Sequence, residues 1–333
     1  MTTVIEPIEY HCIKADIFPD TIKNLPNDEY HNGFPYRHFV SSTQLKDYYI
    51  SPMFAKFKRK NPQLFKISKE SSEVGSLYHY CLESLARTGD LGEYIKNVVI
   101  FNPPINPKTG APFGRETKTY TEQYELFLLE NEGKMIVSKS DYELVDEMTS
   151  RLVGGCRQTS IDVKKLIKWG EPEVSHFVEY EGCKFKYRPD LETKKKIVDW
   201  KTVAADDLHE STIAKIIIKF KYDISAAFYQ FFEHERTGVW KDFFWVFQQK
   251  QPPYDAIIVS AEKWAYDFDG DIVKMGSGAL KFKTILDQHI WCEQNNDWRG
   301  AEVFVMPGFK KQRILVSEPP LYEQTKLITY YND

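Results

Sequence analysis

The chain has 333 residues, of which 42% are hydrophobic and 28% are charged, and its formal net charge is −4. A chain of this length buries enough surface for a full core without disulfides. The net charge excludes a surface covered with basic patches but leaves room for a local basic channel.

Targeting and cofactor signals are weak throughout the sequence. No apolar run is long enough for a membrane span, and the first residues lack the basic and apolar regions of a signal peptide. The five cysteines are scattered without a C-x-x-C pair, which argues against a thiolate zinc site or an iron–sulfur cluster. We therefore expect a protein without a membrane partner, in a reducing, cytoplasmic setting.

The N-terminal part is predicted to contain short elements. Residues 1–38 are polar and punctuated by prolines, and we expect an irregular arm. Ser41 or Ser42 should cap a helix that stops at Ser51-Pro52, and a second short helix should follow. The stretch 56–69 carries basic residues and no acid, so it is either a solvated helix face or a rim that contacts phosphates.

The rest of the chain alternates helical and strand patterns. Apolar residues at helical spacing predict a helix over 74–87, with His79 and Glu83 off the apolar stripe. Beyond it we predict a strand over 94–101, a loop over 102–114, two or three helices between about 116 and 169, strands over 173–181, 183–189 and 195–201, helices over 208–219 and 223–236, strands over 241–249 and 254–260, and a long helix over about 262–295. This order predicts an α/β or α+β domain over 39–300, with a central mixed sheet flanked by helices and a C-terminal tail over 301–333.

The segment YRPDLETKKKIVDWKT (187–202) carries the strongest chemical signal. Strand alternation places Asp199 and Lys201 on one face, and a short hairpin should bring Asp190 close to Asp199. Two carboxylates can bind a hard divalent cation, and a lysine beside them can stabilise charge on a phosphate. The pattern indicates metal-assisted phosphodiester hydrolysis. The alternative is a surface hairpin with ordinary charges.

These residues, in order with others, resemble the PD-(D/E)XK nuclease superfamily and its exodeoxyribonuclease VIII (RecE-type) exonucleases. VGSLYHYCLE resembles that family's G-x-x-x-H helix, and EVSHFVEYEGCKFKYRPDLE resembles its strand pair ending in R-P-D. IVDWKT resembles its I-V-D-x-K-T strand, and YDISAAFYQFF resembles its Y-x-x-Q-x-A-F-Y helix. The resemblance covers residues 39–300 and implies a restriction-endonuclease-like core.

The resemblance also implies a role for each matching residue. Asp190 and Asp199 would bind the principal metal with the backbone carbonyl of Trp200, and Lys201 would orient or activate the attacking water. His79 and Glu173 would serve a second metal. The implied ion is Mg²⁺, with Mn²⁺ as a substitute, and no nucleotide cofactor is implied.

The resemblance also points to candidate residues for contacting DNA. Tyr229 matches the tyrosine that holds the DNA strand, although core packing is an alternative. Ser225 stands where the family has glutamine, and Gln230, beside Tyr229, would point about 100° away from Tyr229 on a helix. Arg188, with Lys184 and Lys186, either contacts the phosphates along a DNA strand or lies on the solvent-exposed face of a hairpin.

By resemblance, the chain would be a Mg²⁺-dependent exonuclease that degrades one strand of linear duplex DNA from the 5′ end and leaves 3′ single-stranded tails for recombination. Its partners would be duplex DNA ends, further copies in a ring, and a single-strand annealing protein, in a bacterial or phage setting. Three alternatives stay open: an endonuclease with the same metal site, a catalytically silent DNA-binding or recombination scaffold, and an unrelated α+β binding protein with a chance hairpin.

Overall fold

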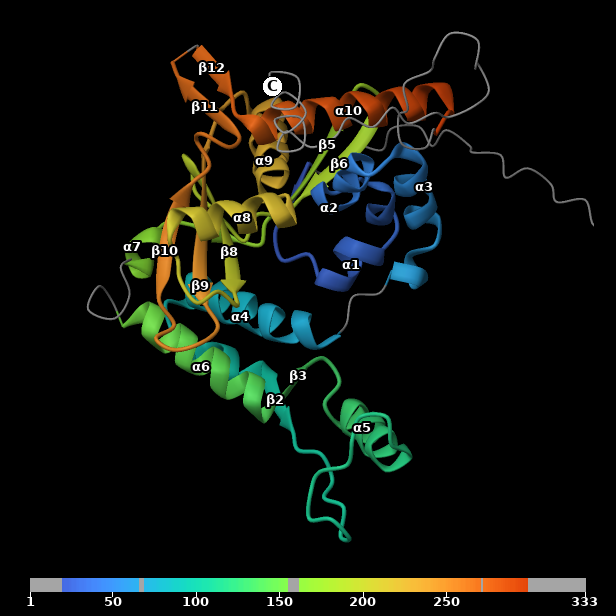
Figure 1. The fold of residues 1–333 in the computed structure, drawn as a ribbon, viewed down its shortest axis with the longest axis vertical. Coiled ribbons are helices and arrows are strands. Elements are labelled where there is room, and N and C mark those ends of the chain that lie inside the picture. The colour runs from blue at the N-terminus through green and yellow to red at the C-terminus, as the bar shows by residue number, and fades with distance from the viewer. Residues whose placement is uncertain (1–19, 66–68, 155–161, 271, 299–333) are drawn as a thin grey trace, which may run out of the picture.

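The structure is a computed structural model that describes residues 20–65, 69–154, 162–270 and 272–298 (Figure 1). A five-stranded sheet in the order β10-β9-β8-β7-β4 forms its centre. Its strands are β4 (Glu171–Pro172), β7 (Leu191–Glu192), β8 (Lys196–Val203), β9 (Asp242–Gln249) and β10 (Ala256–Ser260). β8 and β9 run parallel, while the other neighbouring pairs are antiparallel. The predicted α/β class with a central mixed sheet is confirmed.

A second, antiparallel sheet lies beside the first, in the order β1-β5-β6. It consists of β1 (Thr21–Ile22), β5 (Ser175–Tyr180) and β6 (Cys183–Tyr187). Glu181 and Gly182 both have positive φ angles and make the two-residue turn between β5 and β6.

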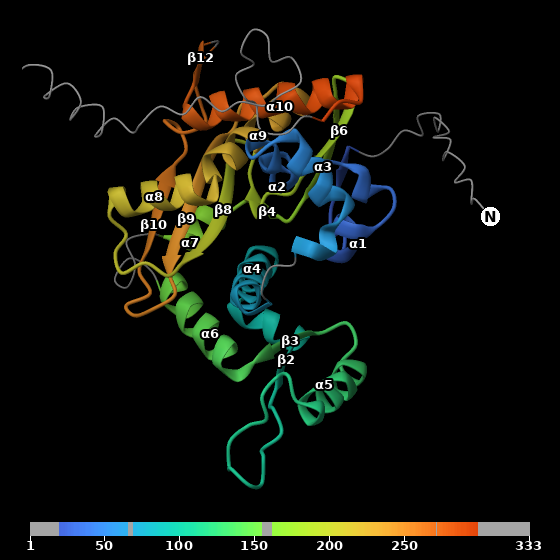
Figure 2. The same cartoon turned by 45° about the vertical axis from the view of Figure 1, so that its right-hand side comes forward.

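Helices cover both faces of the central sheet. In Figures 1 and 2, α10 (Ser277–Asn295) lies towards the top, α4 (Lys69–Thr88) and α6 (Lys139–Val153) lie towards the bottom, and the long strands lie between them. The sequence of β8 explains this arrangement, because Ile197 enters the core shared with α8 (Glu210–Phe220), α9 (Tyr222–Thr237) and α10, whereas Val198 and Trp200 enter the core shared with α4 and α6. The side chains of β8 therefore alternate as predicted, with Asp199 and Lys201 on the face of Ile197.

The short N-terminal helices are α1 (Asn27–Asn32), η1 (Tyr36–His38), α2 (Ser42–Leu45), η2 (Lys46–Tyr49), α3 (Pro52–Lys60) and η3 (Pro62–Phe65). Ser41 caps α2 through a capping box with Gln44, and Pro52 occupies the first turn of α3. The expected irregular arm is wrong for residues 20–38, because β1 pairs with β5 and Tyr30 packs against Phe177. Residues 1–19 lie outside the described residues, as does the predicted tail over 301–333.

The segment between α4 and β4 differs in detail from its prediction. Residues 91–97 form a 3-10 helix, η4 (Leu91–Asn97), and only β2 (Val98–Phe101) is extended. β2 pairs in parallel with β3 (Met135–Ser138), a strand that the sequence pattern did not indicate. The helices of this segment are α5 (Lys118–Glu130), α6 and α7 (Val163–Ile167). α5 buries none of its residues and lies at the far end of the structure from α10 in Figures 1 and 2.

The long helix predicted over about 262–295 is too long at its start. Here β11 (Tyr266–Asp269) pairs in antiparallel with β12 (Ile272–Met275), and α10 begins only at Ser277. Gly270 has a φ of +58° at the turn, a conformation that glycine adopts without strain. The alternating residues Tyr266 and Phe268 before this glycine were the missed signal.

None of the helices in the described ranges combines the length and the apolar character that a membrane span requires.

Candidate active site

The carboxylates of Asp190 and Asp199 meet where β7 pairs with β8. Leu191 lies opposite Val198, so Asp190 and Asp199 come next in the same register. The backbone N–H of Trp200 donates to Oδ2 of Asp190 at 2.6 Å, which fixes that carboxylate against β8. The strand preceding Asp190 differs from the predicted hairpin, because β6 ends at Tyr187 and belongs to the second sheet. Pro189, which has no N–H, lies in the passage between the two sheets.

Lys201 lies in direct contact with Asp199. Its Nζ is 2.6 Å from Oδ2 of Asp199 and also donates to the carbonyl of Trp200 at 3.2 Å. Burial disfavours the charge on Lys201, but Asp199 and Asp190 outweigh it and hold the pKa of the ammonium above its ordinary value. Burial raises the pKa of Asp199, although Lys201 opposes that shift. The site therefore holds a fixed ammonium group next to a carboxylate.

His79 on α4 and Glu173, between β4 and β5, complete the cluster from the other side. Nδ1 of His79 is 3.3 Å from Oδ1 of Asp190, and the ligand atoms of His79, Glu173 and Asp190 lie within 4.8 Å of one another. Glu173 has a φ of +52°, and its backbone N–H donates to the carbonyl of Asp190 at 3.4 Å. A left-handed conformation costs a residue with a side chain about 1 kcal/mol. Such strained positions cluster at functional sites.

The charges of this cluster are incompletely balanced without a cation. Burial, with Asp190 adding to it, raises the pKa of Glu173 to about 8. Burial alone would lower the pKa of His79, but the charge of Asp190 and its hydrogen bond raise it above the ordinary value. Burial likewise opposes the charge of Asp190, yet His79 and Lys201 keep its pKa below the ordinary value.

A divalent cation fits these donors. The carboxylates of Glu173, Asp190 and Asp199 and the carbonyl of Trp200 are hard oxygen ligands of the kind that Mg²⁺ and Mn²⁺ take, and His79 adds a nitrogen. A cation here would also offset the burial and the charge of Asp190 that together raise the pKa of Glu173. The residues that the sequence analysis named as metal ligands therefore lie in one region of the structure.

The residues predicted to contact DNA are placed differently. The hydroxyl of Tyr229 donates to the carbonyl of Arg188 at 3.3 Å, and its ring packs against Tyr187 and Phe243. Burial raises the pKa of Tyr229, and the charges of Tyr30, Asp199 and Asp190 add to the shift. Ser225 lies one turn earlier on α9 and is half-buried. That Tyr229 and Ser225 contact the DNA strand stays a prediction.

Arg188 and its neighbours are held by protein groups. The guanidinium of Arg188 donates to Oγ of Ser175 and to the carbonyl of Leu25, and it covers the ring of Tyr30 at 3.9 Å. Lys186 is buried and donates to the carbonyls of Tyr30 and Tyr36. It therefore neither contacts the phosphates of DNA nor lies on a solvent-exposed strand face, and both expectations are wrong for this residue. A DNA contact by Arg188 stays a prediction.

Gln230 is turned away from the site, as its helical position implied. Its amide donates to the carbonyls of Lys241 and Tyr266, and its oxygen accepts from the N–H of Tyr266. These bonds satisfy a buried amide and leave it unable to replace the glutamine that the family has at position 225.

A polar cavity of about 870 Å³ opens beside His79 and Glu173. Asn24 and Asn27 form part of one wall, and Glu83 and Arg87 of α4 form part of another. Arg87 donates to Asn24, to Glu83 and to the carbonyl of Pro172. No sequence pattern indicated that residues 24–27 line this cavity, because the contact between Asn24 and Arg87 joins distant parts of the chain.

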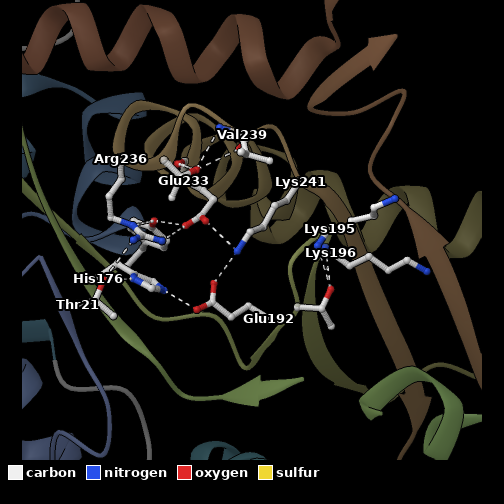
Figure 3. Close-up of polar contacts among 12 residues, drawn as sticks. Thr21, His176, Glu192, Lys195, Lys196, Glu233, Arg236, Val239 and Lys241 are labelled. Atoms are coloured by element: carbon white, nitrogen blue, oxygen red, sulfur yellow. Dashed lines mark hydrogen bonds and ion pairs between the residues drawn. The ribbon is translucent and has the colours of Figure 1, made fainter. Parts of the chain in front are cut away.

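A buried ionic network lies in the interior next to the site (Figure 3). Nε2 of His176 is 2.9 Å from Glu192, while Lys241 bridges Glu192 at 3.1 Å and Glu233 at 2.8 Å. Arg236 pairs with Glu233 at 2.8 Å. Although His176, Glu192 and Glu233 have suitable spacing for a metal, Lys241 and Arg236 already balance the two carboxylates. We interpret this cluster, named here the buried ionic network, as structural.

The fold and the site together define a domain of the PD-(D/E)XK nuclease type. The site combines a Pro-Asp before β7 with the Asp-x-Lys of β8, and the sheet places them in contact. The chain belongs to the family described as "PDDEXK-like domain of unknown function (DUF3799)", whose model matches residues 41–300. Its predicted membership of the superfamily is confirmed.

Other comparisons add little. No curated protein matches the chain. Among solved structures, a crystal structure from Eubacterium rectale described as a "putative exonuclease" is similar, with 16% sequence identity and a TM-score of 0.49. The similarity covers 90% of this chain and 98% of that one.

Proposed function

We propose that this protein is a Mg²⁺-dependent DNA exonuclease that hydrolyses one strand of linear duplex DNA from its 5′ end, leaving 3′ single-stranded tails for recombination. The observation that carries the proposal is the convergence of His79, Glu173, Asp190, Asp199 and Lys201 on one region beside the polar cavity. Carboxylates, a histidine and a lysine in contact are the groups that metal-assisted phosphodiester hydrolysis needs.

Each residue has a distinct chemical task in this proposal. When bound, Mg²⁺ polarises the phosphate and makes water a stronger acid near neutral pH. Asp190, just before β7, and Asp199, on β8, would hold this ion, while His79 and Glu173 would hold a second ion from the side of α4. Lys201, kept as an ammonium by Asp199, stabilises the negative charge that grows on the phosphate. The Trp200 N–H keeps the Asp190 carboxylate oriented throughout.

The complete set of residues favours an enzyme over a catalytically silent scaffold. A protein that only binds DNA has no need of an ammonium held 2.6 Å from a metal-binding carboxylate. Polarity, the recombination role, a ring of copies and an annealing-protein partner are proposed from the family resemblance, as is a cytoplasmic setting.

Digestion of end-labelled DNA tests the exonuclease proposal. Linear and closed circular duplexes are incubated with Mg²⁺ or with EDTA, with the label at either the 5′ or the 3′ end. We expect loss of linear DNA only, dependent on Mg²⁺, with early release of the 5′ label. Cleavage of the circles would instead assign an endonuclease, and early release of the 3′ label would reverse the polarity.

A further inference from the structure

An exposed group of aromatic rings and lysines extends outwards from Lys201. The ring of Tyr222 lies 5.2 Å from Nζ of Lys201 and stacks on Phe220 with 5.5 Å between centroids and 21° between planes. Phe220 is 50% exposed at the end of α8, although Ile213 and Ile217 of the same helix are buried. The stacked pair therefore runs from the active-site lysine to solvent.

Lysines surround this pair. Nζ of Lys219 lies 5.3 Å from the Phe220 ring, and Nζ of Lys221 lies 5.2 Å from the ring of Tyr49, which is 51% exposed. Lys46 belongs to the same 3-10 helix, η2, as Tyr49. Burial lowers the pKa of Lys46 to about 8; the charges of Lys201 and Lys221 add to this shift, while those of Asp199 and Asp223 oppose it.

The acids near this surface are engaged elsewhere. Asp199 pairs with Lys201, Asp223 with Lys281 and Asp47 with Lys58. Within the described ranges, Lys46, Lys219 and Lys221 make no ion pair. The surface is thus locally positive in a chain whose net charge is −4, and its charge is complementary to a nucleic-acid backbone.

The backbone at the corner between α8 and α9 is strained in a way that serves this surface. Lys221 ends α8 and begins α9 with a φ of +53°, a conformation usually taken by glycine. A lysine there costs about 1 kcal/mol. This corner carries Phe220, Lys221 and Tyr222 together, and strained positions of this kind persist where the surrounding structure holds them, often at functional sites.

We infer that Phe220 and Tyr222, flanked by Lys46, Lys219 and Lys221, form a stacking platform for an unpaired nucleotide of the DNA substrate next to the scissile phosphate. The inference rests on the proposed function and names the form of DNA that the site takes: an end whose terminal base is splayed out of the duplex. Aromatic rings bind bases of any sequence by stacking, and lysines bind the phosphates between them. Such a platform would let the enzyme advance along any sequence.

Fluorescence of 2-aminopurine tests the platform without catalysis. The analogue is placed at an unpaired 5′ end of a duplex, and binding is measured in EDTA with the full chain. We expect quenching on binding, and about tenfold weaker affinity for Phe220→Ala, within the range for loss of one stacked base. Phe220→Trp should restore binding, since it keeps a stacking ring.

Matched variants separate stacking from charge and from folding. Ile218→Ala, which removes another exposed apolar side chain of α8 (55% exposed), should bind as the wild type does. Lys221→Ala should reduce the slope of log affinity against log salt by about 0.7, the value for one phosphate contact on a single strand. Circular dichroism shows whether each variant is folded.

Two outcomes would overturn the platform. One is binding by Phe220→Ala that equals the wild type with unchanged quenching. The other is a variant that keeps DNA binding but loses self-association in sedimentation, which would assign the surface to a second copy of the chain. Because these assays use EDTA, a wild type that shows quenching but no Mg²⁺-dependent cleavage would refute the proposed exonuclease and leave the platform standing.

Discussion

Lys201 and Asp199 form the closest charged pair at the proposed reaction centre, with 2.6 Å between Nζ and Oδ2. A carboxylate this close fixes the position of the ammonium before substrate binds. Preorganised charge of this kind is usually the largest contribution to catalysis of charged transition states.

Replacing Lys201 tests its chemical role. Lys201→Ala should lower kcat by about 10²–10³-fold, the usual cost of removing one preorganised charge at a developing anion. DNA binding in EDTA should change by less than about threefold, because the side chain acts on the transition state. Lys195→Ala, at an exposed lysine in the turn before β8, should keep full activity. Cleavage by Lys201→Ala at the wild-type rate would refute the mechanism.

His79 and Glu173 should set the metal requirement. His79→Ala and Glu173→Gln each remove one ligand, and each should raise the Mg²⁺ concentration for half-maximal cleavage by at least about tenfold. The measurement is a Mg²⁺ titration of the cleavage rate, with Glu147→Gln, which removes a surface partner of Arg151, as the control. An unchanged titration curve for both variants would remove α4 from the metal site.

Glu173 also predicts how stability depends on pH when metal is absent. Its pKa of about 8 in the folded protein exceeds its ordinary value of 4.5, so the folded state binds this proton more tightly than the unfolded state. The contribution to stability is full below about pH 4.5 and is lost as the pH rises through 8.

Urea denaturation in EDTA at pH 6 and pH 9 measures this effect. Glu173→Gln should be more stable than the wild type at pH 9 by about 2 kcal/mol, after allowance for partial contact of the carboxylate with water. The two proteins should differ less at pH 6. A wild type that loses no stability relative to Glu173→Gln between these pH values would contradict the shift.

Much of this residue arrangement was predictable from the sequence. Strand alternation placed Asp199 and Lys201 on one face, and the short interval after Asp190 predicted its approach to Asp199. The resemblance supplied His79 and Glu173, since nothing local marks a lone histidine on α4 as a ligand. The burial of Lys186 under Tyr30 was not predictable, because its partners lie about 150 residues away.

At the scale of elements, the site depends on very short strands. β4 and β7 have two residues each, yet they connect Glu173 and Asp190 to the long strand β8. Two-residue strands supply few backbone hydrogen bonds. The buried ionic network compensates, because Glu192 of β7 and His176 of β5 are both held in it (Figure 3).

Glu233 should therefore be important for stability. Its side chain is fully buried and pairs with Lys241 and Arg236, and breaking a buried pair leaves uncompensated charge. Glu233→Ala should lower the free energy of unfolding by about 3–5 kcal/mol. Glu235→Ala, at a more exposed position on the same helix, should change it by less than about 1 kcal/mol. Equal urea midpoints for the two variants would show that the network contributes nothing.

Prediction of elements succeeded where periodicity was long and failed where elements were short. The predicted helix over 74–87 lies within α4, and its apolar stripe from Leu77 to Leu85 is buried. The hairpin β11-β12 and the strand β3 have four residues per strand, the shortest run in which alternation with a period of two can be recognised. β7 is extended where it pairs with β8, and β4 where it pairs with β7 in turn, and a sequence pattern cannot show such pairings.

For the whole molecule, the arrangement reconciles an acidic chain with a nucleic-acid substrate. The net charge of −4 repels DNA at long range. Lys46, Lys201, Lys219 and Lys221 nevertheless gather at one edge of the site, while His79 and Glu173 line the polar cavity. The sequence predicted the class of fold, but the position of residues 20–38 against β5 came only from the structure.

The central claim is that the group of candidate metal ligands around Asp190, together with Lys201, cleaves DNA. Its most direct test follows linear duplex DNA over time with purified protein, in Mg²⁺ and in EDTA, beside Asp190→Asn, which preserves the shape of the side chain but removes its charge. We predict degradation by the wild type in Mg²⁺ and none in EDTA or by the variant. Degradation by Asp190→Asn at the wild-type rate, or none by a folded wild type, would contradict the claim.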